Sequence, residues 1–258
     1  MTDELVKAHN VGAVRVITLN RPHRMNAIDL ELACALRDAL VSASNDAEAR
    51  AIVIAGEGNN FCSGGDLRRD RAKEAAAGID VVDVLQEAFL VLRNGDKASV
   101  AAVQGHAQGA GLSLVLACDF AIADTTAKFG SPFTGVGLVP DMGLAITLPE
   151  RVGISMARDM VLCGTVKNAA AALAAGLVDV VCEPGQALSA ALEKAAVLAG
   201  RAPLAIAAAR ALLNRTRDPV ESVLREESRL QNTLRLTQDA REALAAFGEK
   251  RKPVFRGR

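Results

Sequence analysis

The segment GVGLVPDMG (135–143) places one carboxylate, that of Asp141, among glycine, proline and aliphatic residues. An ordinary aspartate has a pKa of roughly 4 and is a weak base, but an apolar pocket raises that pKa toward the range in which a carboxylate accepts protons efficiently. A structural role is equally open, because Asp before an apolar run is a favoured N-cap, here for a helix predicted over 142–152. The segment therefore predicts either a general base or a helix cap at Asp141.

Two glycine-rich turns offer backbone groups to a ligand. AGEGNNFCSGGDL (55–67) and QGHAQGAGLSLVLACD (104–119) each follow a short apolar run. Glycines permit positive φ and close approach of a ligand, and the second turn leads into an apolar helix predicted to begin near Gly109, where free N–H groups favour negative charge. One such turn alone is more often a tight turn than a site. Two together predict backbone donors that converge on one oxygen atom, an oxyanion hole.

Alternating strands and helices must hold these turns. Short β-branched runs predict strands at 13–20, 51–56, 99–105, 119–124 and 178–183, and longer periodic runs predict helices at 28–43 and 80–94. The strands are apolar on both sides, which is typical of an α/β sheet covered on both faces. Alanine-rich helices are then predicted at 186–199, 203–215 and 218–247. We expect a core over 1–185 and a helical region over 186–258 that packs on the core and on a neighbouring subunit.

Composition excludes several classes of function. The 258 residues carry 30 Lys and Arg against 30 Asp and Glu, and aromatic residues make up 3%. This balance argues against nucleic acid or a membrane as a partner. The five cysteines lack C-x-x-C spacing, so we expect no metal, and their odd number and the absence of a signal peptide favour the cytoplasm. Neither turn has the G-x-G-x-x-G pattern of dinucleotide sites or the G-K-[ST] of a P-loop.

Four segments in register resemble the signature blocks of the crotonase family, also called the enoyl-CoA hydratase/isomerase family. They are LNRPHRMNAID (19–29), FCSGGDL (61–67), QGHAQGAGLSLVLACD (104–119) and GLVPDMG (137–143), and FGEKRKPVF (247–255) is similar to the final helix of the family. The resemblance implies a crotonase-like α/β spiral of ββα units with C-terminal helices that form trimers or dimers of trimers. It also implies an acyl-CoA thioester substrate and no separate cofactor, since coenzyme A is part of that substrate.

The same resemblance assigns roles to individual residues. The N–H groups of Gly65 and Ala110 are expected to hold the enolate oxygen of the thioester, within loops whose Ser63, Gly64 and Gly109 also face the substrate. Arg24, Met25 and Ala27 are expected along the path of the CoA adenine and pantetheine, with Asp66 and Leu67 on the adenine side. Contacts to the CoA phosphates are open for Arg68, Arg69 and Lys250, the last from a neighbouring subunit, because isolated cations are usually solvated surface charges.

The acid/base residues depart from the hydratase pattern. Family hydratases carry two glutamates that hold and deprotonate water, and the matching positions here are Ser113 and Phe133. Ser113 either hydrogen-bonds a water or faces the core, and Phe133 can only pack. Family isomerases place an acidic residue directly after the proline that here precedes Asp141. Asp83 and Glu87 lie one helical turn apart as a possible second acid or as solvated charges, and His106 is expected to point away from the thioester.

These observations favour an enoyl-CoA isomerase that uses Asp141 as its single acid/base. A single carboxylate can take a proton from C2 and return it at C4, whereas hydration needs two positioned groups. Two alternatives stay open: a hydratase with atypical acid/base residues, and a non-catalytic acyl-CoA-binding or scaffold protein. Chain length and ring content of the acyl group do not follow from the sequence.

Overall fold

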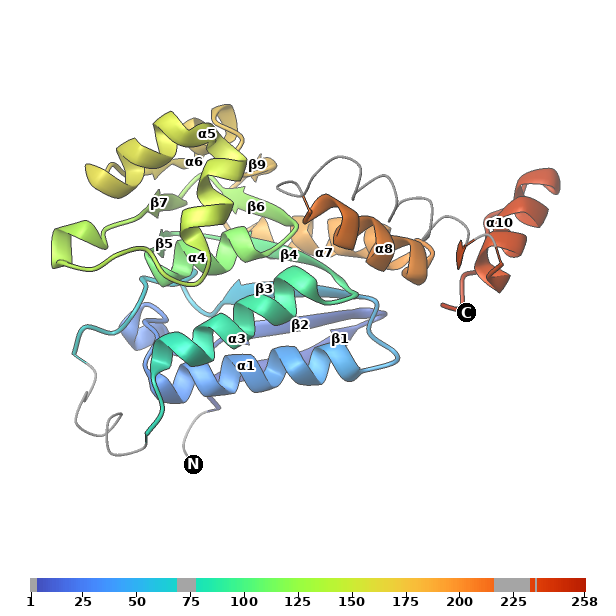
Figure 1. Ribbon diagram of the computed structural model, residues 1–258, viewed down its shortest axis with the longest axis horizontal. Coiled ribbons are helices and arrows are strands. Elements are labelled where there is room, and N and C mark those ends of the chain that lie inside the picture. Colours follow the sequence, from blue (N-terminus) through green and yellow to red (C-terminus); the bar gives the residue numbers. More distant parts are fainter. Residues whose placement is uncertain (1–3, 69–77, 216–232, 235) are drawn as a thin grey trace.

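A mainly parallel sheet forms the centre of the protein (Figure 1). The computed structural model describes residues 4–68, 78–215, 233–234 and 236–258. The sheet has the order β1-β2-β3-β4-β6-β9. Its strands are β1 (Val6–Val11), β2 (Val14–Leu19), β3 (Ala51–Gly56), β4 (Ala98–Val103), β6 (Phe120–Asp124) and β9 (Val180–Cys182). β1 runs antiparallel to β2, and the remaining neighbours are parallel. The two glycine-rich turns follow β3 and β4, so both leave the same edge of the sheet.

A second sheet of three short strands lies beyond that edge. It contains β5 (His106–Gln108), β7 (Lys128–Gly130) and β8 (Lys167–Asn168) in the order β5-β7-β8. β5 belongs to the second glycine-rich turn, and a bridge between Cys62 and Ala107 joins it to the first turn. Backbone pairing therefore fixes the two turns against each other.

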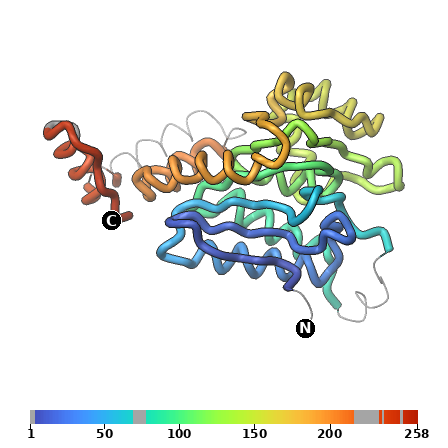
Figure 2. The backbone as a smooth tube through the Cα atoms, turned by 180° about the vertical axis from the view of Figure 1, so that it is seen from behind, coloured from blue at the N-terminus to red at the C-terminus, as the bar shows by residue number. Residues whose placement is uncertain are grey.

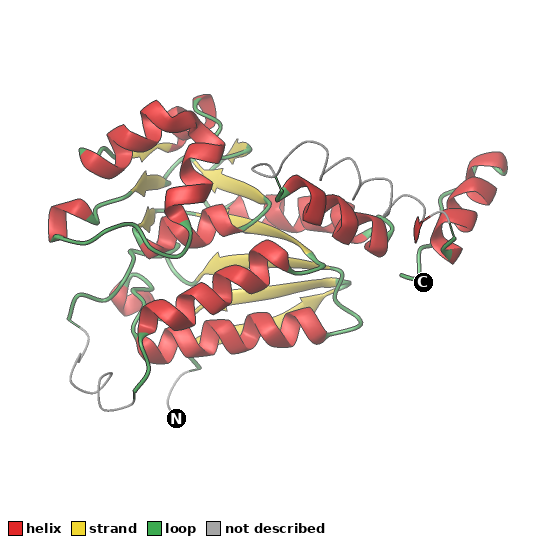
Figure 3. Ribbon diagram, viewed as in Figure 1, coloured by secondary structure: helices red, strands yellow, loops and turns green. Residues whose placement is uncertain are grey.

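Helices cover both faces of the main sheet (Figure 3). The helices α1 (Leu30–Asn45), α3 (Val81–Asn94) and α4 (Ala110–Ala117) bury one face in the larger apolar cluster. On the other face, α7 (Ala187–Ala199) packs Ala187, Ala191, Ala195 and Ala199 against β-branched side chains such as Val53 and Val100. The four-residue spacing of these alanines produces one narrow stripe, so the helix approaches the sheet closely.

The chain continues from β7 through η2 (Thr134–Val136), α5 (Leu144–Leu162) and α6 (Ala169–Ala174), and η1 (Pro22–Arg24) lies earlier, between β2 and α1. α5 is kinked at Gly153, whose φ is +74°. α8 (Pro203–Leu213) contacts β4, whereas α10 (Gln238–Gly248) lies apart from the sheet, as the back view shows (Figure 2). α7, which begins the helical region expected over 186–258, thus belongs to the packed body.

Most predicted elements are confirmed. All five predicted strands and the helices at 28–43 and 80–94 are present within a few residues. β1 was not predicted, because only Val6 of its six residues is buried and no apolar alternation marks it. The predicted helix at 142–152 is α5, which begins at Leu144 and runs further. Of the helix predicted over 218–247, residues 218–232 and 235 lie outside the described residues, and the rest is not one continuous helix, because a turn at 236–237 precedes α10.

No single helix among the described residues is long and apolar enough to cross a membrane. α7 and α8 reach that length and composition only together, as a pair bent by 107°.

Candidate active site

A cavity of about 720 Å³ opens where the two glycine-rich turns meet α3 and the segment before α5. Glycines and aliphatic side chains make up most of its wall. Among the described residues, its only ionisable lining groups are the carboxylates of Asp80, Asp83 and Asp141. The lining also includes Ile28, Ser63, Gly64, Gly65, Leu67, Val81, Leu85, Gly109, Ala110, Phe133, Leu138 and Val139. A largely apolar cavity with a few converging polar groups is the usual form of a small-molecule site.

Gly65 and Ala110, the two expected backbone donors, both line this cavity. Gly64 has φ +99°, and a Cβ atom built on it would lie 2.8 Å from the carbonyl oxygen of Gln108 and 3.7 Å from the nitrogen of Ala110. The turns are therefore in direct contact. In the part of the chain that the structure describes, neither the Gly65 nor the Ala110 N–H donates a hydrogen bond, whereas the N–H groups of Asp66 and Gly109 do. Ala110 is also the first residue of α4, so the helix dipole adds to the attraction for a negative oxygen.

Cys62 supports the first turn from the protein interior. The Gly64 N–H donates to its Sγ at 3.4 Å, and complete burial raises the pKa of this thiol to about 12. A thiol with that pKa stays protonated at neutral pH and is a poor nucleophile. Cys62 therefore packs beneath the first glycine-rich turn as a buried, protonated thiol.

Asp141 lies on the same cavity, in a half-buried position. The backbone turns sharply after it, with φ +48° at Met142 and φ +73° at Gly143. Gly143 occupies the N-cap position of α5 and has no side-chain cap. The interpretation of Asp141 as the N-cap of this helix is therefore wrong, because Gly143 occupies the N-cap position. Asp141 remains one of the residues that line the cavity.

Ser113 and Phe133 occupy the two positions at which family hydratases carry glutamates. Ser113 is fully buried and is not among the residues that line the cavity. Its hydroxyl lies 3.2 Å from the carbonyl oxygens of both Gly109 and Asp141. Phe133 does line the cavity, beside Gly109. Of the two interpretations of Ser113, the core-facing one is confirmed, and its hydroxyl joins the oxyanion turn to the segment that carries Asp141.

We expect Ser113→Ala to lower the free energy of unfolding by about 1 kcal/mol, because the carbonyl that accepts the hydroxyl loses a buried hydrogen bond. Urea titration followed by circular dichroism measures this change. Ser113→Thr is the control, since it keeps the hydroxyl and adds one methyl group. An alanine variant as stable as the wild type would show that the hydroxyl holds neither carbonyl.

The residues expected along the CoA path lie beside the cavity rather than in its wall. Arg24 and Met25 are exposed and Ala27 is half-buried. The Ser63 N–H donates to the Met25 carbonyl at 3.0 Å, which joins this segment to the first glycine-rich turn.

Asn26 holds that segment in place and was missed by the sequence analysis. Its side chain is fully buried, accepts the Arg21 N–H and donates to the carbonyls of Glu57, Asn60 and Phe61. A φ of +53° places it in the left-handed region, which Asn tolerates better than most residues. The only signal in the sequence was an Asn two residues after η1.

Asp66 is buried and forms an ion pair with Arg21, with 2.7 Å between the Asp66 Oδ2 and the Arg21 Nη1. Burial alone would raise the pKa of this carboxyl, but the hydrogen bonds from the Arg21 guanidinium and the Arg68 N–H outweigh it and hold the pKa below its usual value. Asp66 does not line the cavity, whereas exposed Leu67 does. Asp66 thus fixes the end of the first glycine-rich turn to the segment 19–29.

The lowered pKa of Asp66 predicts a pH effect on stability. The folded state favours the charged carboxylate, so its stabilisation is complete above the unfolded-state pKa of roughly 4 and is lost as pH falls through the lower folded-state pKa. As pH falls from about 4 to the acid limit of folding, we expect the free energy of unfolding to decrease less for Asp66→Asn than for the wild type. Urea midpoints across this window measure the difference. Identical acid slopes for both proteins would contradict it.

The remaining candidates separate into two groups. Asp83 lines the cavity, as does Asp80, an acid that the sequence analysis did not consider and that caps α3 through the Val82 N–H. Glu87 instead forms an ion pair with Arg37, 3.3 Å away. The other candidates do not line the cavity: His106 lies in β5, Arg68 is exposed, and Lys250 follows α10, a helix that lies apart from the sheet (Figure 1). Arg69 lies outside the described residues.

Within those same described residues, no group of three or more His, Cys, Asp or Glu side chains is placed to hold a metal ion. In that part of the chain, the cavity presents the undonated N–H groups of Gly65 and Ala110, a largely apolar wall and carboxylates. This set can stabilise an enolate and move a proton.

Comparison with known proteins agrees with this chemistry. The family model described as enoyl-CoA hydratase/isomerase matches residues 9–258. A probable enoyl-CoA hydratase of Rhizobium meliloti is 37% identical, with 100% of each chain covered. The 2,3-dehydroadipyl-CoA hydratase of Escherichia coli is 36% identical over 95% of this chain and 96% of the relative. The crystal structure of an enoyl-CoA hydratase from Polaromonas sp. JS666 superposes with a TM-score of 0.90 at 34% identity and covers 97% of this chain and 99% of the other.

The structural match confirms the predicted crotonase-like α/β fold, and the sequence matches extend over the core and the C-terminal helices alike. The names of the relatives are mostly hydratase names. The family, sequence and structure matches, together with the cavity, establish that this chain is an acyl-CoA enzyme that belongs to the crotonase, or enoyl-CoA hydratase/isomerase, family.

Proposed function

We propose that this enzyme shifts the double bond of an enoyl-CoA from the β,γ to the α,β position, with Asp141 as its acid/base. One observation carries the proposal. Asp141 shares a cavity with the Gly65 and Ala110 donors, while the two positions of the hydratase glutamates hold the buried Ser113 and the apolar Phe133. A proton shuttle needs one carboxylate, and the activation of water needs a second positioned group.

The reaction follows from the geometry in two steps. The thioester oxygen accepts hydrogen bonds from the N–H groups of Gly65 and Ala110, which makes the C2 proton more acidic. Asp141 takes that proton, and the electron pair of the C–H bond passes into an enolate whose charge rests on the thioester oxygen. Asp141 then returns the proton at C4, and the double bond ends between C2 and C3. Each donor is worth roughly 3 kcal/mol in such sites.

Hydration is the second candidate. The names of the relatives favour it, since most are hydratases. Asp83 and Asp80 also line the cavity and offer further carboxylates for a water molecule. A third possibility is an acyl-CoA-binding protein without turnover.

The test supplies the purified protein with a trans-3-enoyl-CoA and, separately, with a trans-2-enoyl-CoA. Conjugation of the double bond gives an ultraviolet absorbance increase in the first reaction, and hydration gives a decrease in the second. We expect fast conjugation and slow hydration. Fast hydration with no conjugation would replace the isomerase proposal with the hydratase one. Tight binding of both thioesters without turnover would favour a binding protein.

We also propose a homotrimer or a dimer of trimers. The C-terminal region exposes apolar side chains that a lone chain leaves in water, namely Leu213 of α8, Leu236 in the turn before α10 and Leu244 of α10. Burial of such side chains between subunits is favourable. Sedimentation equilibrium measures the assembly, and a monomer at micromolar concentration would contradict it. The proposal includes a contact between Lys250 of one subunit and the CoA phosphates bound to another.

A further inference from the structure

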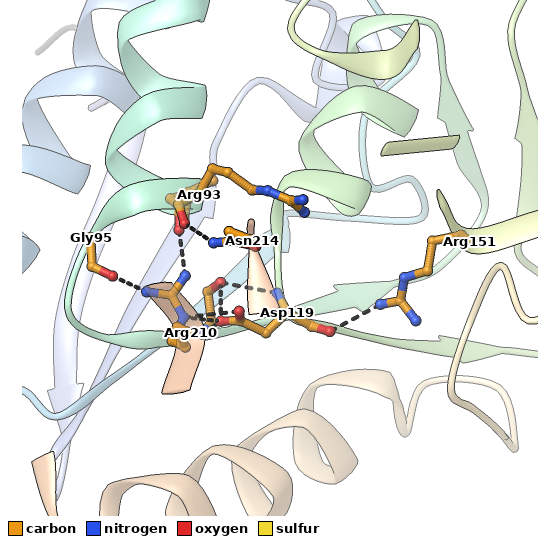
Figure 4. Close-up of polar contacts among 8 residues, drawn as sticks. Arg93, Gly95, Asp119, Arg151, Arg210 and Asn214 are labelled. Atoms are coloured by element: carbon orange, nitrogen blue, oxygen red, sulfur yellow. Dashed lines mark hydrogen bonds and ion pairs between the residues drawn. The ribbon is translucent and has the colours of Figure 1, made fainter. Parts of the chain in front are cut away.

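A buried arginine of the C-terminal helices, Arg210, lies at the C-terminal ends of α3 and α4 (Figure 4). The Arg210 side chain, in α8, is 8% exposed, and its partner Asp119 is 23% exposed. We propose that Arg210 is a positioning residue that sets the relative placement of the acyl-pocket helix α3 and the oxyanion helix α4. The inference rests on the proposed role of the cavity as the acyl-CoA site.

Arg210 uses its whole guanidinium. Its Nε donates to both carboxylate oxygens of Asp119 at 2.9 Å. Its Nη2 donates to the Leu92 carbonyl at 2.6 Å, and its Nη1 donates to the Gly95 carbonyl. Leu92 belongs to the last turn of α3 and Gly95 is its C-cap, so the guanidinium binds carbonyls that the helix itself leaves without partners. A positive charge at a helix C-terminus is also favoured by the dipole.

Asp119 connects the same arginine to α4 and the sheet. It follows the C-cap of α4, Cys118, by one residue. Its carboxylate also accepts the backbone N–H of Ser99 at 2.7 Å and lies 3.1 Å from the Ser99 hydroxyl, in β4. Arg210 therefore joins the C-terminal ends of α3 and α4 through one rigid, planar group.

The third helix of the site is tied to this cluster by two contacts. Arg93 of α3 forms an ion pair with Glu150 of α5 at 2.8 Å. Arg151 donates to the Asp119 carbonyl at 3.0 Å. α5 begins three residues after Asp141, so the same cluster also connects to the helix behind the proposed base.

Each of these helices points back to the cavity. The N-terminal turn of α3 supplies Val81 and Leu85 to the acyl wall, and the first residue of α4 is the oxyanion donor Ala110. The 14 residues of α3 span about 21 Å, so a tilt of about 5° at its anchored end moves its cavity end by about 2 Å. A misplacement of about 1 Å can cost two orders of magnitude in rate.

The test compares hydrogen–deuterium exchange in the wild type and Arg210→Met. We expect faster exchange at both remote ends, 81–85 in α3 and 110–113 in α4. Faster exchange confined to the neighbours of the lost guanidinium, 92–97 and 118–120, would overturn the proposal. Arg15→Met is the control, since it breaks another part-buried arginine–aspartate pair, with Asp46 2.7 Å away, that touches neither helix.

Kinetics give a second measurement. We expect Arg210→Met to lower kcat by about 10- to 100-fold, with the affinity for free CoA within about twofold of the wild type, because the CoA segment does not contact the cluster. A folded variant with unchanged kcat would also overturn the proposal.

Arg210→Lys carries the test if the methionine variant does not fold. An ammonium group keeps the pair with Asp119 but cannot reach the Leu92 and Gly95 carbonyls at once, so exchange should rise more at 81–85 than at 110–113. Wild-type exchange at both sites would overturn the proposal. A wild type without turnover would count against the proposed function alone, because exchange needs no reaction.

Discussion

Asp141→Asn is expected to lower the rate of double-bond isomerisation by about 10²- to 10⁴-fold, the usual contribution of a positioned acid/base. The amide is nearly isosteric with the carboxylate, so the cavity keeps its shape, but the amide does not accept the C2 proton. The oxyanion donors at Gly65 and Ala110 stay in place. Affinity for the substrate thioester should therefore change little while kcat falls, measured by conjugation of a trans-3-enoyl-CoA.

Asp83→Asn is the matched control, because Asp83 is a carboxylate on the wall of the same cavity. Its loss removes one negative charge without touching the segment before α5. We expect it to keep kcat within about threefold of the wild type, in line with a solvated charge. If Asp83→Asn abolished turnover and Asp141→Asn did not, the base would be on α3 and the proposal for Asp141 would be wrong.

Gly64→Ala is expected to lower kcat by about 10²- to 10³-fold, comparable with the loss of one oxyanion donor. The φ of +99° is a conformation that residues with a Cβ rarely adopt, and the new Cβ would lie 2.8 Å from the Gln108 carbonyl oxygen. The atoms that this Cβ would meet, in Gln108 and Ala110, belong to the backbone and cannot rotate away. The first turn must therefore move, and the Gly65 N–H moves with it. Steady-state kinetics on the preferred enoyl-CoA, with circular dichroism as a check of folding, give the result.

Gly12→Ala separates backbone strain from the effect on the site. Gly12 lies in the turn between β1 and β2 with φ +58°, and a Cβ there would meet nothing within 4 Å. This variant should cost about 1 kcal/mol of stability and leave kcat unchanged. A Gly64→Ala enzyme with wild-type kcat would mean that the first turn does not carry an oxyanion donor.

Much of the site could be predicted because it depends on local chemistry. A turn that needs positive φ requires glycine, so Gly64 and Gly109, with φ of +99° and +55°, were visible as glycines after apolar strands. Strand ends in a parallel sheet share one edge, which explains why two turns separated by about forty residues meet. Asp141 was visible because its carboxylate interrupts an apolar segment.

Other features followed no local rule. Ser113 looked like a substitute for a catalytic glutamate, and only packing showed that its hydroxyl lies between the carbonyls of Gly109 and Asp141. Asp83 and Glu87 looked alike in the sequence, one helical turn apart, and only the structure showed that Asp83 lines the cavity while Glu87 pairs with Arg37. Asn26 was unremarkable until its amide was found among three carbonyls of the neighbouring turn.

Residue types that constrain the backbone, and apolar runs that must be buried, are properties of short segments, so the α/β fold, the two turns and the isolated carboxylate could be predicted from the sequence. The partner of a buried charge is a property of the folded chain. Arg210 and Asp119 are 91 residues apart, and an arginine in an alanine-rich helix has the same local pattern whether it faces water or an aspartate. Only the tertiary structure brings α8 to the ends of α3 and α4. Burial of a guanidinium is costly unless carboxylate and carbonyl oxygens accept its hydrogen bonds, and those oxygens converge only in the folded chain.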